Sequence, residues 1–138
     1  MNTFNRLIRF NRYIYLHFGT GIKSLYVCNI LHAWIRWYYH CEIPLSLNIE
    51  NCYFNHSGFG IVINPQTVLG KNIDIQHDVT IGVKNRSSRA PLIQDNVRIG
   101  AKATIIGPIT VGQDSIIGAG AVVVKDVPPP FYCCWESC

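Results

Sequence analysis

The side chains of this 138-residue sequence that could carry chemistry include five histidines and six cysteines. A zinc site needs three or four histidine, cysteine or carboxylate ligands at a recognisable spacing. Only two histidines, His56 and His77, lie in the central part of the chain, and their spacing fits no such pattern. We therefore predict no metal site. The run Gly118-Ala119-Gly120 is no phosphate loop either, because no helix follows it.

The cysteines indicate no disulfide framework, since three of the six fall within the last six residues. The first residues contain arginines but neither a continuous apolar stretch nor a small-residue cleavage site, so they make a poor export signal. The longest apolar run, 25–39, is broken by Asn29, His32 and Arg36, which argues against a membrane span. We expect reduced thiols in a cytoplasmic protein.

Composition narrows the class of protein further. Apolar residues make up 49% of the chain, enough for a core, and charged residues only 14%, so general disorder is excluded. The net charge of +4 suits an anionic small molecule or an anionic membrane surface. It is too small to indicate nucleic-acid binding, for which we predict no role.

A six-residue repeat determines the expected fold. From residue 63 onward an aliphatic side chain recurs at every sixth position, with one exception at Ser87. Small or β-branched side chains recur four positions later. The repeated aliphatic residues are Ile63, Leu69, Ile75, Ile81, Ile93, Ile99, Ile105, Val111, Ile117 and Val123, and the residues that follow them at four include Val79, Val97, Ala103, Ser115 and Ala121.

This period fits neither an α-helix nor an ordinary hairpin, but it fits a triangular prism of short parallel strands with one hexad on each face. We predict an all-β solenoid, a left-handed parallel β-helix, over residues 41–127; the hand is taken from the known hexapeptide-repeat class. The register extends weakly upstream through Ile43 and Ile49 and slips across residues 55–62. Residues 83–92 should form an extruded loop, and glycines should turn the corners, where a positive φ costs them little.

Residues 1–40 form an N-terminal helical and aromatic segment in this prediction, with a helix over 25–39 because that stretch contains neither Gly nor Pro. Its aromatic residues must pack against the chain's own prism, a neighbouring subunit or a membrane surface. The sequence alone leaves these three partners open.

The prism also carries aliphatic side chains at outward or corner-adjacent positions. Packing three prisms side by side would bury them and create grooves between subunits, so a homotrimer is expected. These outward residues are Ile61, Val62, Ile106, Val122 and Val124.

Two stretches resemble a known family. Residues 41–82 contain a histidine just before G-I-V-I and a V-T-I-G corner, and residues 105–129 contain G-P-I-T-V-G and D-V-P-P. Over about residues 40–129 the chain resembles the serine acetyltransferase family of hexapeptide-repeat acyltransferases, above all the short members found in capsule and exopolysaccharide clusters. The resemblance implies a trimer with acetyl-CoA, the co-substrate, in the groove between adjacent prisms.

The resemblance also assigns roles to residues. His56 matches the family's catalytic histidine, which would take the proton of an acceptor hydroxyl as it attacks the thioester. Glu42, in Cys41-Glu42-Ile43, matches the family's aspartate in V-D-I and would orient that base. Glutamate adds one methylene to this pair, and Glu50 is the second candidate.

The acceptor-binding residues differ from the family pattern. Serine-specific members carry Arg-His-Pro in the extruded loop, where this chain has Arg89-Ala90-Pro91. Arg89 keeps a guanidinium that could hold a carboxylate, but the histidine is absent, and so is the long N-terminal helical domain. Both departures favour a sugar hydroxyl over serine. His77 would line the acceptor site or face solvent.

Acetyl-CoA would lie along corners made of small residues, because its pantetheine arm needs backbone N–H and C=O groups. Such residues also suit a corner for structural reasons alone. Lys102 and Lys125 are candidate partners of the CoA phosphates. The small corner residues are Gly82, Gly100, Ala101, Gly118 and Ala119.

The last residues, 128–138, depart from the family. After the prolines, members continue with a segment like S-I-V-x-G-N-P-A, whereas this chain reads PFYCCWESC. A one-nucleotide shift in a back-translation of this tail yields H-S-I-V-A-G-N-P, so we treat a frameshift as a hypothesis that the gene sequence would test.

The leading hypothesis from the sequence is therefore an acetyl-CoA-dependent O-acetyltransferase that acts on a hydroxyl of a saccharide or of serine. It would use direct attack and no covalent acyl-enzyme, because no Cys or Ser sits in a nucleophile constellation beside His56. The alternative is a non-catalytic, truncated trimeric β-helix scaffold or a decayed gene product. Acetyl-CoA turnover distinguishes the two.

Overall fold

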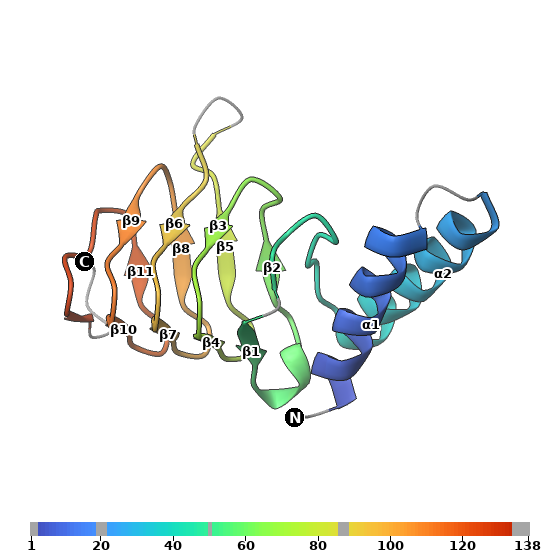
Figure 1. Cartoon of the computed structure of the whole chain (residues 1–138). Helices are drawn as coiled ribbons and strands as arrows, with labels where there is room; N and C mark the ends of the chain where they lie inside the picture. Colours follow the sequence, from blue (N-terminus) through green and yellow to red (C-terminus); the bar gives the residue numbers. More distant parts are fainter. Residues whose placement is uncertain (1–2, 19–21, 50, 86–88, 134–138) are drawn as a thin grey trace.

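A computed structural model describes residues 3–18, 22–49, 51–85 and 89–133 of the chain (Figure 1). Two helices, α1 (Thr3–Phe18) and α2 (Ile22–Tyr39), precede a solenoid of short strands. In Figure 1 the helices lie at one end of the solenoid, and strands β9, β10 and β11 lie towards the other.

Within the described residues, twelve strands and one 3₁₀ turn build the solenoid. They are β1 (Cys52–Phe54), η1 (His56–Gly58), β2 (Val62–Ile63), β3 (Val68–Leu69), β4 (Ile73–Ile75), β5 (Thr80–Gly82), β6 (Leu92–Ile93), β7 (Arg98–Ile99), β8 (Thr104–Ile106), β9 (Thr110–Val111), β10 (Ile116–Ile117), β11 (Val122–Val123) and β12 (Tyr132–Cys133).

The strands form three parallel sheets, one for each face of the prism. Their orders are β1-β4-β7-β10-β12, β11-β8-β5-β2 and β3-β6-β9. Successive strands of the chain therefore belong to different sheets, and each strand from β1 to β8 pairs with the strand three places further on, whereas β12 pairs with β10. The pairing is parallel throughout, as in Ile81 with Ile105. This arrangement confirms the parallel hexapeptide-repeat solenoid that the sequence period predicts.

The core of the prism is the predicted aliphatic ladder. Every ladder residue from Ile63 to Val123 is buried, and Ile43 and Ile49 are buried as well. The small side chains at the fourth following position, from Val79 to Ala121, are also buried. One residue predicted to face outward, Ile61, is fully buried and belongs to this core.

The corner glycines serve a different purpose from the one predicted. Gly70, Gly100 and Gly112 do not have a positive φ. Instead, a Cβ on Gly100 would lie 2.6 Å from the backbone nitrogen of Ala119 in the next coil, so glycine is required there by close approach between coils. The left-handed conformation falls two residues later, on side chains such as Asn72 (φ 55°) and Lys102 (φ 61°).

The described residues between β5 and β6, 83–85 and 89–91, stand out from the prism (Figure 1). The chain leaves the solenoid after Gly82 and re-enters it at Leu92, which pairs with Val68 and Thr110. The loop thus ends one residue earlier than predicted. At the other end, Tyr132 and Cys133 of the atypical tail pair with β10 and continue its sheet.

The helices pack on the chain's own solenoid, which is one of the three partners left open by the sequence. Phe4, Ile8, Ile35 and Tyr39 are buried in the same core cluster as the strands. The Phe4 ring meets both Tyr39 and Phe54 edge-on, with ring centroids 4.7 and 5.8 Å apart. Helix α1 was not predicted as a separate element, and α2 begins three residues before the predicted helix.

Polar side chains of α1 occupy the open edge of β1. The Asn5 amide donates to the carbonyl oxygen of Phe54 and accepts from its backbone N–H, both at 3.1 Å. Arg9 donates to the carbonyl oxygen of Cys52 at 3.0 Å. Because an uncovered edge strand exposes unpaired backbone groups, α1 closes this end of the sheet.

We expect Asn5→Ala to lower the free energy of unfolding by about 1–3 kcal/mol, because the buried N–H and C=O of Phe54 lose their partner. Chemical denaturation measures the change. Asn29→Ala, on the exposed side of α2, is the matched control and should change stability by less than about 0.5 kcal/mol. Equal effects of the two substitutions would show that Asn5 does not seal the edge.

Candidate active site

A three-residue insertion places His56 outside the regular coil. Eight residue positions separate Phe54 from Val62, whereas five separate their partners Ile75 and Thr80. The surplus is η1, His56-Ser57-Gly58, whose turn is closed by a hydrogen bond from the N–H of Gly58 to the carbonyl oxygen of Asn55. This is the register slip predicted from the sequence, and it projects His56 outward.

The inserted turn has an unusual backbone. His56 (φ 49°), Ser57 (φ 61°) and Gly58 (φ 62°) all adopt left-handed conformations. Side chains other than glycine rarely do so, and strained residues of this kind gather at functional sites when the surroundings hold them. The Phe4 ring supplies part of that hold, because it covers Gly58 so closely that a Cβ there would lie 2.1 Å from it.

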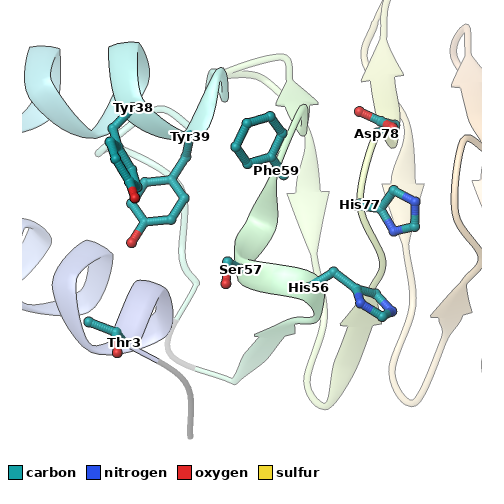
Figure 2. A pocket seen from close by; sticks show the side chains of 8 residues that line it. All are labelled: Thr3, Tyr38, Tyr39, His56, Ser57, Phe59, His77 and Asp78. Atoms are coloured by element: carbon teal, nitrogen blue, oxygen red, sulfur yellow. The ribbon is translucent and has the colours of Figure 1, made fainter.

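His56 opens onto a pocket of about 670 Å³ between the helices and the solenoid (Figure 2). The His56 and His77 rings meet edge to face, with centroids 5.0 Å apart and planes at 83°. Two imidazoles at one end of an open pocket can exchange protons with a bound hydroxyl group. The pocket is lined by Thr3, Tyr38, Tyr39, His56, Ser57, Phe59, His77 and Asp78.

His77 has one polar atom that the protein leaves unsatisfied. Its Nδ1 is buried and has no hydrogen-bond partner among the residues that the structure describes. Since a buried polar group without a partner costs free energy, this nitrogen is suited to a hydrogen bond with a bound molecule. His77 therefore lines the pocket, which is one of the two placements expected for it.

Small residues continue the same corner along the solenoid axis. The N–H of Lys102 donates to the carbonyl oxygen of His77, and the N–H of Gly120 donates to that of Ala101. His77, Ala101 and Ala119 thus stack in successive coils. We call this edge the histidine corner; it comprises residues 55–61, 76–79, 100–103 and 118–121. Five predicted cofactor residues lie on it, namely Gly100, Ala101, Lys102, Gly118 and Ala119.

The other predicted binding residues lie elsewhere in the chain. Gly82 ends β5, and Lys125 follows β11, both at the next corner of the prism. Arg89 lines a separate pocket of about 580 Å³ with Pro108 and Thr110. We call this edge the loop corner; its described residues are 83–85, 89–91, 107–109 and 124–126. A single chain does not bring Arg89 to His56.

Glu42 also differs from its expected placement. Its carboxylate lies 3.5 Å from the Arg36 guanidinium of α2, and it does not line the His56 pocket. The backbone explains this position, because Glu42 forms a parallel bridge with Val62, beyond the inserted turn. The structure therefore gives no support to an orienting contact between Glu42 and His56.

We expect Glu42→Gln to leave acetyl transfer within a few-fold of wild type and to change the free energy of unfolding by less than about 1 kcal/mol, the usual value of an exposed ion pair. Arg36→Gln should have the same effect, and the double variant should add little. A tenfold or greater loss of turnover in Glu42→Gln alone, at unchanged stability, would restore the orienting role.

The space beside each glycine also tests whether it could border a bound cofactor. A Cβ on Gly100 would meet the neighbouring coil, so glycine there has a structural reason. A Cβ on Gly82 or on Gly120 would meet nothing within 4 Å, so both backbones border open space. At Gly120 that open space lies on the histidine corner, where an extended ligand could approach the main chain.

Three buried cysteines, Cys28, Cys41 and Cys52, are not nucleophiles. Burial raises the pKa of Cys41 to about 11 and that of Cys52 to about 12, so both thiols stay protonated near neutral pH. Burial also raises the pKa of Cys28. All three are free of disulfides, and the structure offers no thiolate at the His56 pocket among them.

Sequence reasoning missed the aromatic side of the pocket. Tyr38 and Tyr39 enter it from the end of α2, and Phe59 enters from the residue after η1. The aromatic richness of 25–39 was visible in the sequence, but no local pattern connects a helix end to a histidine seventeen residues later. Only the packing of Tyr39 against Phe4 makes that connection.

Comparison with known proteins is consistent with this architecture. Residues 90–125 match the family model described as bacterial transferase hexapeptide (six repeats). The serine acetyltransferase of Bacillus pumilus is 35% identical over 108 residues, which are 77% of this chain and 50% of the relative. The chain spans about half the length of this relative.

The solved structures that resemble this chain include further serine acetyltransferases. Neisseria gonorrhoeae serine acetyltransferase in complex with serine is 33% identical with a TM-score of 0.63, covering 91% of this chain and 50% of that one. Brucella abortus serine acetyltransferase in complex with coenzyme A is 30% identical with a TM-score of 0.72, covering 89% and 48%.

The repeat, the three-sheet solenoid and the family-model match define a hexapeptide-repeat solenoid of the kind found in bacterial transferases. Within that class, the chain is similar to the serine acetyltransferases over about half of their length.

Proposed function

We propose that this chain is an acetyl-CoA-dependent O-acetyltransferase in which His56 is the general base. The observation that carries the proposal is the strained η1 turn, which holds His56 beside His77 in an open pocket. A hydroxyl is a poor nucleophile near neutral pH, so a base within hydrogen-bond reach must remove its proton during attack on the thioester.

In this mechanism the acceptor hydroxyl loses its proton to His56 as its oxygen bonds to the acetyl carbonyl carbon. The tetrahedral intermediate then collapses, the C–S bond breaks, and the proton passes from His56 to the departing thiolate. A backbone N–H of the histidine corner would stabilise the oxyanion. The raised pKa of Cys41 and of Cys52 favours direct transfer over an acyl-cysteine.

Acetyl-CoA would lie along the histidine corner. Ala101 and Ala119 leave its backbone accessible in the coils beyond His77, and Lys102 adds an exposed cation for a phosphate. The Brucella relative was solved in complex with coenzyme A, which supports the same co-substrate here. Gly82 and Lys125, at the loop corner, would contribute only from a neighbouring subunit.

A homotrimer would provide that neighbour. The sheet β11-β8-β5-β2 lies between the two corners, and its exposed aliphatic residues include Val62, Val122 and Val124. Cyclic assembly joins unlike surfaces of adjacent subunits. The loop corner of one prism, with Arg89, would then face the histidine corner of the next.

The acceptor would be a hydroxyl of a saccharide or of serine. Tyr38, Tyr39 and Phe59 give the pocket aromatic walls, which suit the apolar faces of a sugar ring. Arg89 in a neighbouring subunit could instead hold the carboxylate of serine. The Neisseria relative was solved with serine, so both acceptors must be assayed.

The test is thiol release from acetyl-CoA by the purified chain, with serine, with a panel of saccharides and without acceptor, followed by mass spectrometry of the products. We expect acceptor-dependent release, an O-acetylated product and a trimer in analytical ultracentrifugation. A trimer without turnover on any acceptor would instead support a scaffold, and a monomer would contradict a shared site.

A further inference from the structure

The outer side of α2 is apolar, although no residue in the described part of the chain covers it. Apart from Asn29 and Arg36, its exposed residues between 26 and 38 are all aliphatic or aromatic. Trp37 is 74% exposed and Tyr26 69%. We call this stripe the aromatic face; it comprises Tyr26, Val27, Ile30, Trp34, Trp37 and Tyr38. A helix that is apolar on every side normally has a second partner.

The helical hairpin, residues 1–41, carries charge of one sign, although Arg36 of α2 pairs with Glu42 at 3.5 Å. No acidic residue precedes Glu42, whereas residues 1–41 contain five of the twelve basic residues of the chain. Residues 42–138 hold the other seven together with all eight acidic residues, so they are close to neutral. The helical hairpin is therefore a cationic module attached to a nearly neutral solenoid.

From this pattern we infer that the helical hairpin docks on the surface of an anionic lipid bilayer through the aromatic face. Tryptophan and tyrosine suit the boundary between headgroups and acyl chains, because one part of each ring system is apolar and the other forms hydrogen bonds. Basic residues beside such a face add attraction to anionic lipids. Neither described helix is long and apolar enough to cross a membrane, so the hairpin would lie in the interface.

A second copy of the chain is a poorer occupant of the same face. Pairing two hairpins would bring together two cationic modules with no acidic residue on either. Like charges at an interface are unfavourable, whereas an anionic bilayer supplies the complementary charge.

The aromatic face is continuous with the candidate active site. Trp34 stacks on Tyr38 with ring centroids 5.4 Å apart and planes at 10°, and Tyr38 lines the pocket with His56 and His77. A bilayer on this face would lie next to the pocket. The inference concerns binding alone and does not depend on acetyl transfer.

Vesicle flotation with the full chain tests whether the helical hairpin docks on an anionic bilayer. We expect binding to phosphatidylcholine vesicles that contain phosphatidylglycerol, weakening as salt increases, and much less binding to phosphatidylcholine alone. Trp37→Ser should lower the partition coefficient about tenfold or more. Arg6→Gln, an exposed charge on α1, should lower it about fivefold.

Tyr132→Ser is the matched control, because Tyr132 is also 74% exposed but lies at the far end of the solenoid. It should bind vesicles like the wild type. Absence of vesicle binding would overturn the inference, and so would equal binding by the Trp37→Ser and wild-type chains. A Trp37→Ser chain that changes only its oligomeric state would assign the face to a second copy instead.

Discussion

Replacement of His56 by alanine is expected to lower acetyl transfer by roughly 10²–10⁴-fold, the usual contribution of a general base. The loss should appear in kcat, because the acceptor proton no longer has a recipient as the C–O bond forms. Binding of acetyl-CoA and the trimer should survive, since His56 is exposed and contributes nothing to the aliphatic core. Steady-state kinetics and isothermal titration measure the two effects.

His40→Ala is a close control for this substitution. His40 is also exposed and also has a φ of 49°, but it does not line the pocket. Its replacement should leave turnover within a few-fold of wild type. Near-normal turnover in His56→Ala, with a loss in His77→Ala, would move the base to His77.

Gly58→Ala is expected to have the second large effect. A Cβ at this position would lie 2.1 Å from the Phe4 ring, and the residue has a φ of 62°. Overpacking and a left-handed alanine together should lower the free energy of unfolding by about 2–4 kcal/mol. Because Gly58 closes the turn that holds His56, turnover should fall as well, even where the protein is folded.

Gly120→Ala separates the clash with Phe4 from the cost of a left-handed alanine. Gly120 is left-handed too, with a φ of 72°, but a Cβ there would meet no atom within 4 Å. Gly120→Ala should lower the free energy of unfolding by only about 1–2 kcal/mol, because only the left-handed backbone opposes the alanine there. Adding Phe4→Leu to Gly58→Ala should recover part of the lost stability if the clash is the cause. Equal costs of the two glycine substitutions would show that Phe4 does not constrain the turn.

The solenoid could be predicted because its determinants repeat in the sequence. Each coil meets the same steric requirement for an inward aliphatic residue. The sequence distances between Ile81, Ile105 and Val123 are therefore multiples of six, and these residues stack in successive coils. The glycines repeat for a related reason. The assignment of positive φ to Gly70, Gly100 and Gly112 was wrong, because close approach at Gly100 and left-handed backbone at Lys102 are separate requirements of one corner.

The site was only partly predictable because it is built where the repeat fails. The slip that contains His56 was visible, but its outcome depends on Phe4 and Tyr39, which reach it from helices with no fixed sequence distance to it. Glu42 matched a family position, yet its side chain pairs with Arg36 of α2, six residues earlier. Neither kind of contact leaves a periodic signal.

The central claim is that acetyl transfer takes place at the histidine corner, and a crystal structure of the chain with bound coenzyme A tests it most directly. We predict the pantetheine arm along Ala101 and Ala119, with its sulfur at the His56 and His77 end of the corner. Coenzyme A bound in any other place, with its sulfur remote from both histidines, would contradict the claim.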